Sequence, residues 1–362
     1  MDAVLDELIS RVQAAADARR PLRIRAGGTK DFYGNAPRGD LLDPRVWSGI
    51  ESHEPSELVI TVRAGTPLRE VEDALAATNQ MLAFEPPHFG EAATIGGCVA
   101  AGLSGPRRNS AGYTHGGVRD SVLGARLLDG RGRLLRFGGT VIKNVAGYDV
   151  SRVLAGSLGM LGVIIDVSLK VLPRPATEAT LRFDLDEAQA LHQLNQWGGR
   201  PLPISASCWR DGQLWLRLSG SQAAVSQAAQ SLCQEGRGGD CLDATEVISF
   251  WRDLREQNAG WFAGATALWR VSVPTTAEPL DLGDQCIEWG GALRWVRTSM
   301  PATTIRERAR VLGGHATLFR GEDRSQGVFT PLAAPLAAIH QRLKEEFDPA
   351  RIFNPGRMYE GL

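Results

Sequence analysis

The stretch RAGGTKDFYG, from Arg25 to Gly34, follows the strand-like segment PLRIR and contains three glycines and an aromatic pair but no hydrophobic period. Glycines after a strand let backbone N–H groups approach a phosphate closely, because no Cβ intervenes and positive φ angles are free. The stretch fits neither the GxxxxGK[ST] pattern of a P-loop nor the GxGxxG pattern of a dinucleotide-binding fold. Taken alone, it is compatible with a surface turn as well as with a phosphate-binding loop.

Three further glycine-marked segments follow along the chain. They are TIGGCVAAGLSG at residues 94–105, KNVAGYDVSRVLAGSLGMLGVI at residues 143–164, and NPG at residues 354–356. A single run of spaced glycines usually indicates tight helix packing. Four glycine-marked segments in a fixed order are a more specific signal and favour a nucleotide-binding site built from distant parts of the chain.

The order R-x-G-G-T, T-I-G-G, KNxxGYD with GSLGxLGVI, and a terminal DPxxIFNPG resembles the PCMH-type FAD-binding domain of the vanillyl-alcohol oxidase superfamily. The resemblance covers Pro21 to about Pro175 and returns at the C-terminus. Within the superfamily, two segments are most similar to the FAD-binding subunits of bacterial glycolate oxidases. They are KNVAGYDVSRVLAGSLGMLGVI and the C-terminal IFNPGRMY. The resemblance implies that FAD lies between two α+β subdomains.

The expected fold class is α+β, with a two-subdomain PCMH-type FAD-binding domain and an antiparallel-sheet cap domain. From residue 179 onward, strands and helices repeat without glycine loops, and Leu214, Leu216 and Leu218 alternate as in a half-buried strand. The expected boundaries are 1–175 for the FAD-binding domain (subdomains about 1–88 and 89–175), 176–330 for the cap or substrate-type domain, and 331–362 for a C-terminal helix and NPG tail that return to the FAD-binding domain.

Local patterns predict several individual elements. An amphipathic helix is expected at the N-terminus, a strand at residues 58–63, and a helix from Pro67 to about Thr78 with Thr66 as its N-cap and Pro67 at its first position. A further helix is expected around residues 149–155. In the second domain, the predicted strands cover residues 179–184, 204–209, 213–220, 267–273, 292–298 and 315–321.

The resemblance assigns the cofactor contacts. The first two loops would hold the FAD diphosphate through backbone amides, residues 163 and 164 would meet the adenine side, and residues 143 and 144 would lie near the flavin. The implied set is Arg25, Gly27, Gly28, Thr29, Lys30, Thr94, Ile95, Gly96, Gly97, Gly105, Lys143, Asn144, Val163, Ile164 and Asn354. Some members of the superfamily attach FAD covalently through a His after the paired glycines. This sequence has Thr29 there, which predicts non-covalent FAD.

The catalytic residues cannot be assigned from the sequence. Oxidation of a 2-hydroxy acid requires a base and a cation for the carboxylate, and the candidates are His315, Arg320 and Lys143. His315 and Arg320 are five residues apart in one predicted strand, which would place them on opposite faces. The metal-binding His pair and the GDGNxH and EHG stretches of related D-2-hydroxy acid dehydrogenases are absent, and no metal site is predicted.

Three functions remain open. In the first, the chain is the FAD-binding subunit of a glycolate oxidase complex that oxidises glycolate to glyoxylate, with a paralogous flavoprotein and an iron–sulfur subunit as partners. In the second, it is a stand-alone FAD-dependent dehydrogenase of a small 2-hydroxy acid such as D-lactate. In the third, it is a structural subunit whose FAD only stabilises the fold. Five tryptophans offer a candidate partner surface: Trp251, Trp261, Trp269, Trp289 and Trp295.

Composition excludes other classes. Charge is nearly balanced, with 40 Lys and Arg against 41 Asp and Glu, so no nucleic-acid partner is expected. No apolar run approaches the roughly 18 residues that cross a bilayer, and the acidic N-terminus is unlike a signal peptide. We therefore expect a cytoplasmic protein that reaches the inner membrane only through partners. The five scattered cysteines predict free thiols and no iron–sulfur cluster in this chain.

Overall fold

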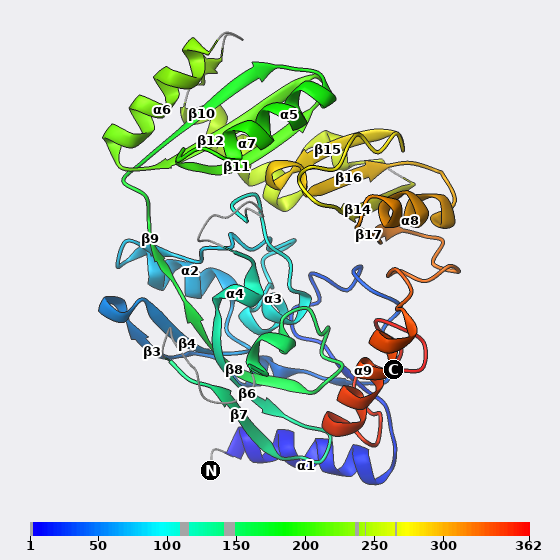
Figure 1. The fold of residues 1–362 in the computed structure, drawn as a ribbon. Coiled ribbons are helices and arrows are strands. Elements are labelled where there is room, and N and C mark those ends of the chain that lie inside the picture. Colours follow the sequence, from blue (N-terminus) through cyan, green and yellow to red (C-terminus); the bar gives the residue numbers. More distant parts are fainter. Residues whose placement is uncertain (1–2, 109–115, 141–148, 236–238, 243, 265) are drawn as a thin grey trace. The chain divides into compact units, whose positions relative to one another are not determined.

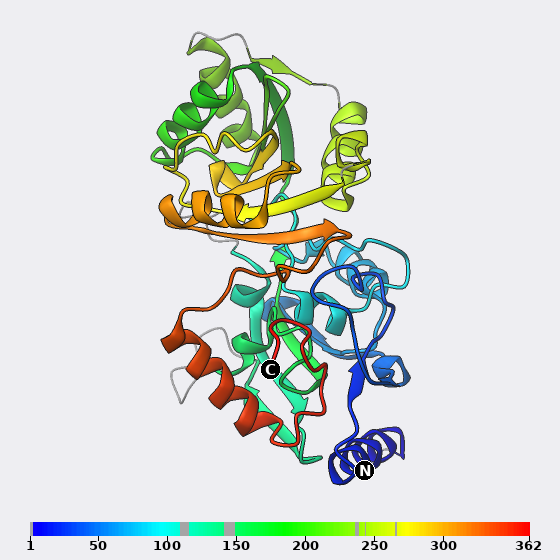
Figure 2. The ribbon, with the colours of Figure 1, turned by 90° about the vertical axis from the view of Figure 1, so that its right-hand side faces the viewer.

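The computed structural model describes residues 3–108, 116–140, 149–235, 239–242, 244–264 and 266–362. The chain forms two compact units, shown as ribbons in Figure 1 and Figure 2. The first unit comprises Met1–Leu103, Gly117–Pro173 and Pro331–Leu362, and the second comprises Ser104–Gly116 and Arg174–Thr330. Residues 104–108, which the sequence predicts to be part of the FAD-binding domain, therefore belong to the second unit.

A five-stranded antiparallel sheet forms the centre of the first unit. Its strand order is β3 (Ile50–Glu54), β4 (Val59–Arg63), β8 (Val163–Lys170), β6 (Val122–Leu128) and β7 (Leu134–Gly138). The central strand β8 is buried along most of its length, as expected for the continuous apolar run VIIDVSL between two neighbours. Two short pairs complete the strands of this unit: β1 (Leu22–Ile24) runs parallel to β2 (Asp40–Leu42), and β5 (Gln80–Met81) is antiparallel to β9 (Leu172–Pro173).

Helices α2 (Leu68–Ala76) and α3 (Ile95–Ala101) pack their apolar side chains into the core of this sheet. The unit also contains α1 (Ala3–Asp17), the one-turn helix α4 (Val118–Ser121), and α9 (Ala334–Phe347). The N-terminal amphipathic helix is confirmed, since Leu5, Leu8 and Val12 of α1 are buried at helical spacing. The stretch predicted as helical at 149–155 contains a short 3-10 helix, η3 (Ser151–Leu154).

The predicted N-cap of α2 is wrong. Pro67 occupies the cap position and makes no side-chain cap hydrogen bond. The Thr66 hydroxyl instead lies 2.7 Å from the carbonyl oxygen of Arg63, to which it donates, and it accepts the N–H of Gly49 at 2.8 Å. Thr66 thus closes the turn that leaves β4. The hydrogen bond between Thr66 and Gly49 joins residues 17 positions apart, so local sequence spacing could not predict it.

The second unit is built on an eight-stranded antiparallel sheet, as the sequence predicts. Its order is β13-β10-β12-β11-β15-β16-β14-β17. The strands are β10 (Thr177–Asp184), β11 (Ile204–Arg210), β12 (Gln213–Gly220), β13 (Asp240–Cys241), β14 (Ala267–Ser272), β15 (Asp284–Glu288), β16 (Leu293–Arg297) and β17 (His315–Gly321). The sequence analysis missed β13 and β15, because each is short and follows a stretch rich in acidic residues and glycine.

Four helices flank this sheet. On one face, α5 (Glu187–Gly198) and α6 (Gln222–Gln234) cover Leu214, Leu216 and Leu218 of β12, and α8 (Ala302–Val311) covers β14 and β17. The three leucines are fully buried, which confirms their period-2 pattern. On the other face, α7 (Ala244–Glu256) contacts the sheet through Trp251, whose indole N–H donates to Thr180 at 3.0 Å.

The segment at residues 104–108 is tied to the second unit through a buried arginine. Arg107 donates to the Glu178 carboxylate at 2.6 Å, and the Ser219 hydroxyl donates to the same oxygen at 2.6 Å. Burial opposes ionisation of Glu178, but the charges of Arg107 and Arg217 and these hydrogen bonds outweigh it. The pKa of Glu178 is therefore lowered.

Replacing Glu178 by Gln is expected to lower the free energy of unfolding by about 1 kcal/mol at neutral pH, allowing for solvent screening of a partly exposed carboxylate. Because the folded-state pKa is lowered, this contribution is complete above the unfolded value near 4.5 and is lost as pH falls through the folded value. Urea unfolding from pH 7 to pH 3 measures the difference. The exposed Glu322→Gln is the control, and a difference that stays constant with pH contradicts the assignment.

The tryptophan-rich second unit does not offer the predicted aromatic surface. Trp251, Trp269, Trp289 and Trp295 are all buried. These four tryptophans are therefore core residues.

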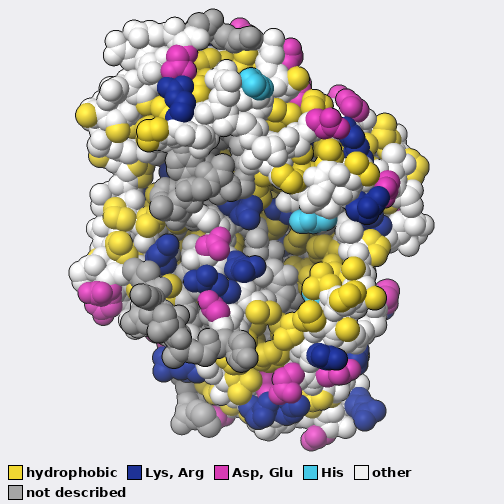
Figure 3. All heavy atoms as spheres, in the orientation of Figure 1, with side chains coloured by type: hydrophobic (Ala, Val, Ile, Leu, Met, Phe, Trp, Pro, Cys, Tyr) yellow, Lys and Arg dark blue, Asp and Glu magenta, His cyan; other side chains and the backbone are white. Residues whose placement is uncertain are grey.

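The apolar side chains that are exposed in the first unit include Val153 of η3 and Leu336 and Ile339 of α9. Figure 3 shows apolar side chains gathered over this part of the first unit.

Candidate functional site

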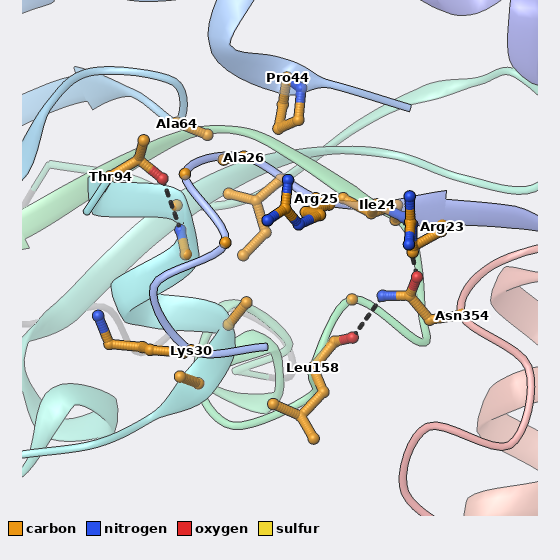
Figure 4. A pocket seen from close by; sticks show the side chains of 18 of the residues that line it. Arg23, Ile24, Arg25, Ala26, Lys30, Pro44, Ala64, Thr94, Leu158 and Asn354 are labelled. Carbon is orange, nitrogen blue, oxygen red and sulfur yellow. Dashed lines mark hydrogen bonds between the residues drawn. The ribbon is translucent and has the colours of Figure 1, made fainter. Parts of the chain in front are cut away.

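The four glycine-marked segments contribute to one cleft in the first unit (Figure 4). It has about 890 Å³ of unfilled space, including the part open to solvent. The cleft lies where the chain leaves β1, passes the start of α3, enters β8 and returns in the C-terminal tail. The predicted residues that line it are Arg25, Gly27, Gly28, Thr29, Lys30, Thr94, Gly96, Gly97, Val163, Ile164 and Asn354.

The first loop, residues 25–30, has unused donors. Within the described part of the chain, the amides of Gly27, Gly28 and Thr29 donate no hydrogen bond, although the carbonyl of Gly28 accepts from the N–H of Asp31. Gly28 has a φ of +69°, which favours glycine. At Gly27 a Cβ would lie 1.6 Å from the carbonyl oxygen of Ala92, so no side chain can be accommodated. The loop combines close packing with adjacent free N–H groups, as an anion-binding loop requires.

Basic side chains surround this loop. Arg25 and Lys30 are labelled in Figure 4. Arg25 forms an ion pair with Asp31, and Lys30 donates to the carbonyl of His88 at 3.1 Å. The Nε atom of Arg23 is buried and has no hydrogen-bond partner among the described residues. Arg357 also lines the cleft. Four basic side chains against one acidic side chain favour a ligand with more than one negative charge.

The second segment, at the start of α3, contributes differently from the prediction. The N–H groups of Ile95 and Gly96 already donate to the carbonyls of Thr66 and Ala64, at 3.0 and 2.9 Å. The Gly97 N–H donates to the Thr94 hydroxyl at 3.2 Å, as drawn in Figure 4. The role of Gly96 is to let α3 pack closely against Ala64, since a Cβ at residue 96 would collide with it. The predicted role of Ile95 and Gly96 as phosphate donors is not supported.

The C-terminal tail supports the cleft through Asn354. Its side-chain oxygen accepts the N–H of Ile24 at 2.8 Å, and its side-chain nitrogen donates to the carbonyl of Leu158 at 2.7 Å. Its backbone N–H donates to the carbonyl of Leu22. Figure 4 shows Asn354 joined in this way to the segment at Leu158. Asn354 thus links the tail, β1 and the third glycine segment, and one N–H of its side-chain amide is already used by Leu158.

A buried ion pair between α9 and the residue that follows it stabilises the segments around the cleft. Lys344 of α9 is 1% exposed and Asp348 is fully buried. The Lys344 ammonium donates to Asp348 at 2.8 Å, to the carbonyl of Met160 at 2.7 Å and to the carbonyl of Phe353 at 2.8 Å. Burial lowers the pKa of Lys344, and Asp348 opposes that shift. All three ammonium protons are used, so Lys344 fixes the third and fourth segments together.

Two of the predicted contacts do not line the cleft, and two others fall outside the part of the chain that the structure describes. Ile95 is buried in the core, and Gly105 lies in the second unit, where its carbonyl accepts the indole N–H of Trp289 at 3.0 Å. Lys143 and Asn144 lie outside the described residues. Conversely, four residues that were not predicted also line the cleft: Arg23, Asp31, Leu158 and Arg357. Asp31 and Leu158 lie within glycine-marked segments and the two arginines lie next to them, and that position was the only available signal.

The catalytic candidates His315 and Arg320 share a face of the sheet, contrary to the prediction. Leu318 lies opposite Trp269, but Arg320 lies opposite Leu268, so Phe319 is an extra residue in β17. This β-bulge reverses the alternation of side chains beyond it. His315 pairs with Ser272, and Ser272 and Leu268 alternate on the same side of β14. The third candidate, Lys143, lies outside the described residues.

The described residues contain neither a candidate metal site nor a membrane-spanning helix. No group of three His, Cys, Asp or Glu side chains in that part of the chain is placed to hold a metal ion. No helix there is both long and apolar enough to cross a membrane. The lack of a metal site in the whole chain stays a prediction.

Comparison with known proteins defines the class. The family described as FAD binding domain matches residues 4–138. Among solved structures, alkyldihydroxyacetonephosphate synthase superposes with a TM-score of 0.65 at 14% identity, covering 97% of this chain and 75% of that one, which shows a shared fold. The chain thus carries an FAD-binding domain of the PCMH type, as its glycine segments predict.

More specific relatives are also found. The glycolate oxidase subunit GlcE of Escherichia coli is 46% identical over 98% of this chain and 97% of its own length. This chain belongs to the family of that subunit. The glycolate oxidase subunit GlcD of Bacillus subtilis and the D-lactate dehydrogenase of Archaeoglobus fulgidus are each 31% identical. They match 49% and 47% of this chain and 37% of their own lengths.

Proposed function

We propose that this chain is the FAD-binding subunit of an assembly that oxidises glycolate to glyoxylate. The observation that carries the proposal is the cleft of the first unit, where adjacent free amides at Gly27, Gly28 and Thr29 face an excess of basic side chains. These residues fit the diphosphate of FAD, which needs several N–H donors and positive charge. Family membership supports glycolate as the substrate of the assembly.

Each part of the cleft then has a defined task. The first loop holds the diphosphate through its amides, and Arg23 and Arg25 supply charge. Val163 and Ile164, which line the cleft at the start of β8, provide apolar contacts. Asn354 and Lys344 position the surrounding segments through their hydrogen bonds. Bound FAD would supply the hydride acceptor for oxidation of the hydroxyl carbon.

We expect the FAD to be bound without a covalent bond, because Thr29 follows the paired glycines and carries no nucleophile that forms a stable flavin adduct. Precipitation of the loaded protein with acid should leave all the FAD in the supernatant, where its absorbance measures it. Flavin that stays with the washed polypeptide would contradict this expectation.

The partners are proposed to be a paralogous flavoprotein subunit and an iron–sulfur subunit, so that electrons from glycolate leave through the assembly. The relative GlcE is named as a subunit, which supports a multi-subunit assembly. The test is anaerobic addition of glycolate to the FAD-loaded chain, alone and after mixing with the partners. Loss of flavin absorbance only in the mixture supports the proposal. Rapid loss in the isolated chain would favour a stand-alone dehydrogenase.

One observation favours that second candidate. The β-bulge in β17 places His315 and Arg320, which lie at opposite ends of that strand, on one face of the sheet, so that a base and a cation share this face. Burial and the positive charge of Arg270 lower the pKa of His315, so its imidazole is neutral and can accept a proton at neutral pH. The glycolate experiment separates the two candidates directly.

A further inference from the structure

Helix α9 presents much of its apolar face to solvent rather than to the first unit. It has 14 residues, but only Lys344 and Phe347, in its last turn, are buried. Leu336 and Ile339 are 45% and 53% exposed, and with Leu343 they follow the spacing that places side chains on one face of a helix. Most of the stability of such a helix comes from packing of its apolar face. The exposed stripe is therefore typical of a helix that packs against another chain.

A groove of the first unit continues this stripe. It has about 1310 Å³ of unfilled space, including the part open to solvent. Leu343 of α9, Val153 of η3 and the neighbouring Met160 and Leu161 line it, and Val153 is 42% exposed. Contiguous exposed apolar surface in a folded protein marks an interaction site. We call this surface the α9 groove: Val153, Met160, Leu161, Leu336, Ile339 and Leu343.

A cation lies at the α9 groove. Arg119 of α4 lines the groove and is exposed, and it forms no ion pair within the part of the chain that the structure describes. Two other basic side chains that line the groove are already matched. Arg152 lies 2.9 Å from the Asp149 carboxylate, and Lys344 lies 2.8 Å from that of Asp348. Arg119 is therefore the charge that an acidic group on a partner can match.

We propose that the α9 groove docks an amphipathic helix of another subunit of the assembly, a helix that carries apolar side chains with an Asp or Glu beside them. Recognition of a helix in a groove uses apolar anchors spaced three and four residues apart, and the carboxylate would pair with Arg119. That the occupant is a subunit of the glycolate-oxidising assembly rests on the proposed function.

The charges around α9 favour a protein partner over a membrane surface. An interfacial helix that binds anionic lipid carries several Lys or Arg residues on its polar face. The polar side chains of α9 near the groove are mixed in charge, since the exposed Arg342 is followed by the exposed Glu345 and Glu346. One cation beside a concave apolar surface suits a single carboxylate on a helix better than a layer of lipid headgroups.

The test is binding of the full chain to each proposed partner subunit, the paralogous flavoprotein and the iron–sulfur subunit, measured by biolayer interferometry at several salt concentrations. We expect Ile339→Glu and Arg119→Glu each to weaken binding to the same partner at least roughly tenfold. Arg119→Gln should also reduce the dependence of the association rate on salt. These side chains are exposed, so the variants should unfold at the same temperature as wild type.

Two exposed residues provide the matched controls. Val311 of α8 is 61% exposed in the second unit, and Arg69 of α2 is exposed in the first unit. Neither lines the α9 groove. Val311→Glu and Arg69→Glu introduce the same kinds of change as the test variants, and both should bind the partner as tightly as wild type does.

The proposal is overturned if wild type binds neither subunit, if either Ile339→Glu or Arg119→Glu binds as tightly as wild type, or if the controls weaken binding equally. Two measurements on the chain alone test other occupants: sedimentation velocity for a second copy, and flotation with vesicles of phosphatidylcholine and phosphatidylglycerol for a membrane. Self-association or vesicle binding that Ile339→Glu abolishes would also overturn it.

The glycolate experiment separates this proposal from the proposed function. If wild type binds its partner, the test variants do not, and glycolate reduces no flavin in the mixture, only the proposed function is refuted. If the mixture oxidises glycolate and Ile339→Glu joins it with wild-type affinity, only the docking site is refuted.

Discussion

Replacing Gly27 by Ala is expected to weaken FAD binding roughly a hundredfold. The new Cβ would lie 1.6 Å from the carbonyl oxygen and 2.5 Å from the carbonyl carbon of Ala92, and neither backbone atom can rotate away. The first loop would have to move, and its free amides would move with it. Strain of about 2–3 kcal/mol corresponds to a loss of affinity of roughly a hundredfold. Quenching of flavin fluorescence during titration measures this affinity.

Gly199, at the end of α5 and outside the cleft, provides the matched control for this substitution. A Cβ at Gly199 would meet only the carbonyl oxygen of Gln196, at an ordinary contact distance of 3.6 Å. Gly199→Ala should therefore bind FAD as tightly as wild type. In the cleft itself, Gly96→Ala should not be tolerated, because that Cβ would lie 2.6 Å from the Cβ of Ala64. Wild-type affinity in Gly27→Ala would contradict the assigned loop.

Replacing Lys344 by Met is expected to lower the free energy of unfolding by about 3–5 kcal/mol, because it leaves the buried Asp348 carboxylate without its counter-charge. The carbonyls of Met160 and Phe353 also lose a donor. Urea unfolding followed by circular dichroism measures the change. Arg342→Met, an exposed substitution on the same helix, should change stability by less than about 0.5 kcal/mol.

A double variant tests whether the charge pair causes this loss. Asp348 also accepts the N–H groups of Ile352 and Phe353, at 3.0 and 2.8 Å, and Asn can retain one of these contacts. Lys344→Met with Asp348→Asn should therefore be destabilised by less than the sum of the two single variants. Additive effects would show that the two side chains act independently. FAD affinity should fall in Lys344→Met, since both tethered segments flank the cleft.

The sequence predicted the location of the cleft well, because the glycines themselves carry the geometric requirement. Gly27 and Gly28 tolerate no side chain or need a positive φ, and such demands are visible in the residue type. The alternation of Leu214, Leu216 and Leu218 likewise follows directly from burial of one strand face. Local rules decide these features, so local patterns reveal them.

Other features depend on distant contacts and were not predictable. The bulge at Phe319, which places Arg320 on the same face of the sheet as His315, is set by pairing with β14 and leaves no local signature. The sequence motif suggests that the N–H groups of Ile95 and Gly96 are available to a ligand, but they donate hydrogen bonds to the carbonyls of residues 66 and 64. Asn354 appears as a ligand contact in a glycine motif, yet both ends of its side chain hold backbone groups. These hydrogen bonds form only when the fold is complete.

The central claim is that the first glycine loop recognises the diphosphate of FAD. The most direct measurement is equilibrium titration of the purified chain with FAD and, in parallel, with riboflavin, which has the same ring system but no phosphate. The account predicts saturation at one FAD per chain and binding of riboflavin that is weaker by roughly a hundredfold or more, because several charge-assisted hydrogen bonds are lost. A folded chain that does not bind FAD, or that binds riboflavin as tightly as FAD, would contradict it.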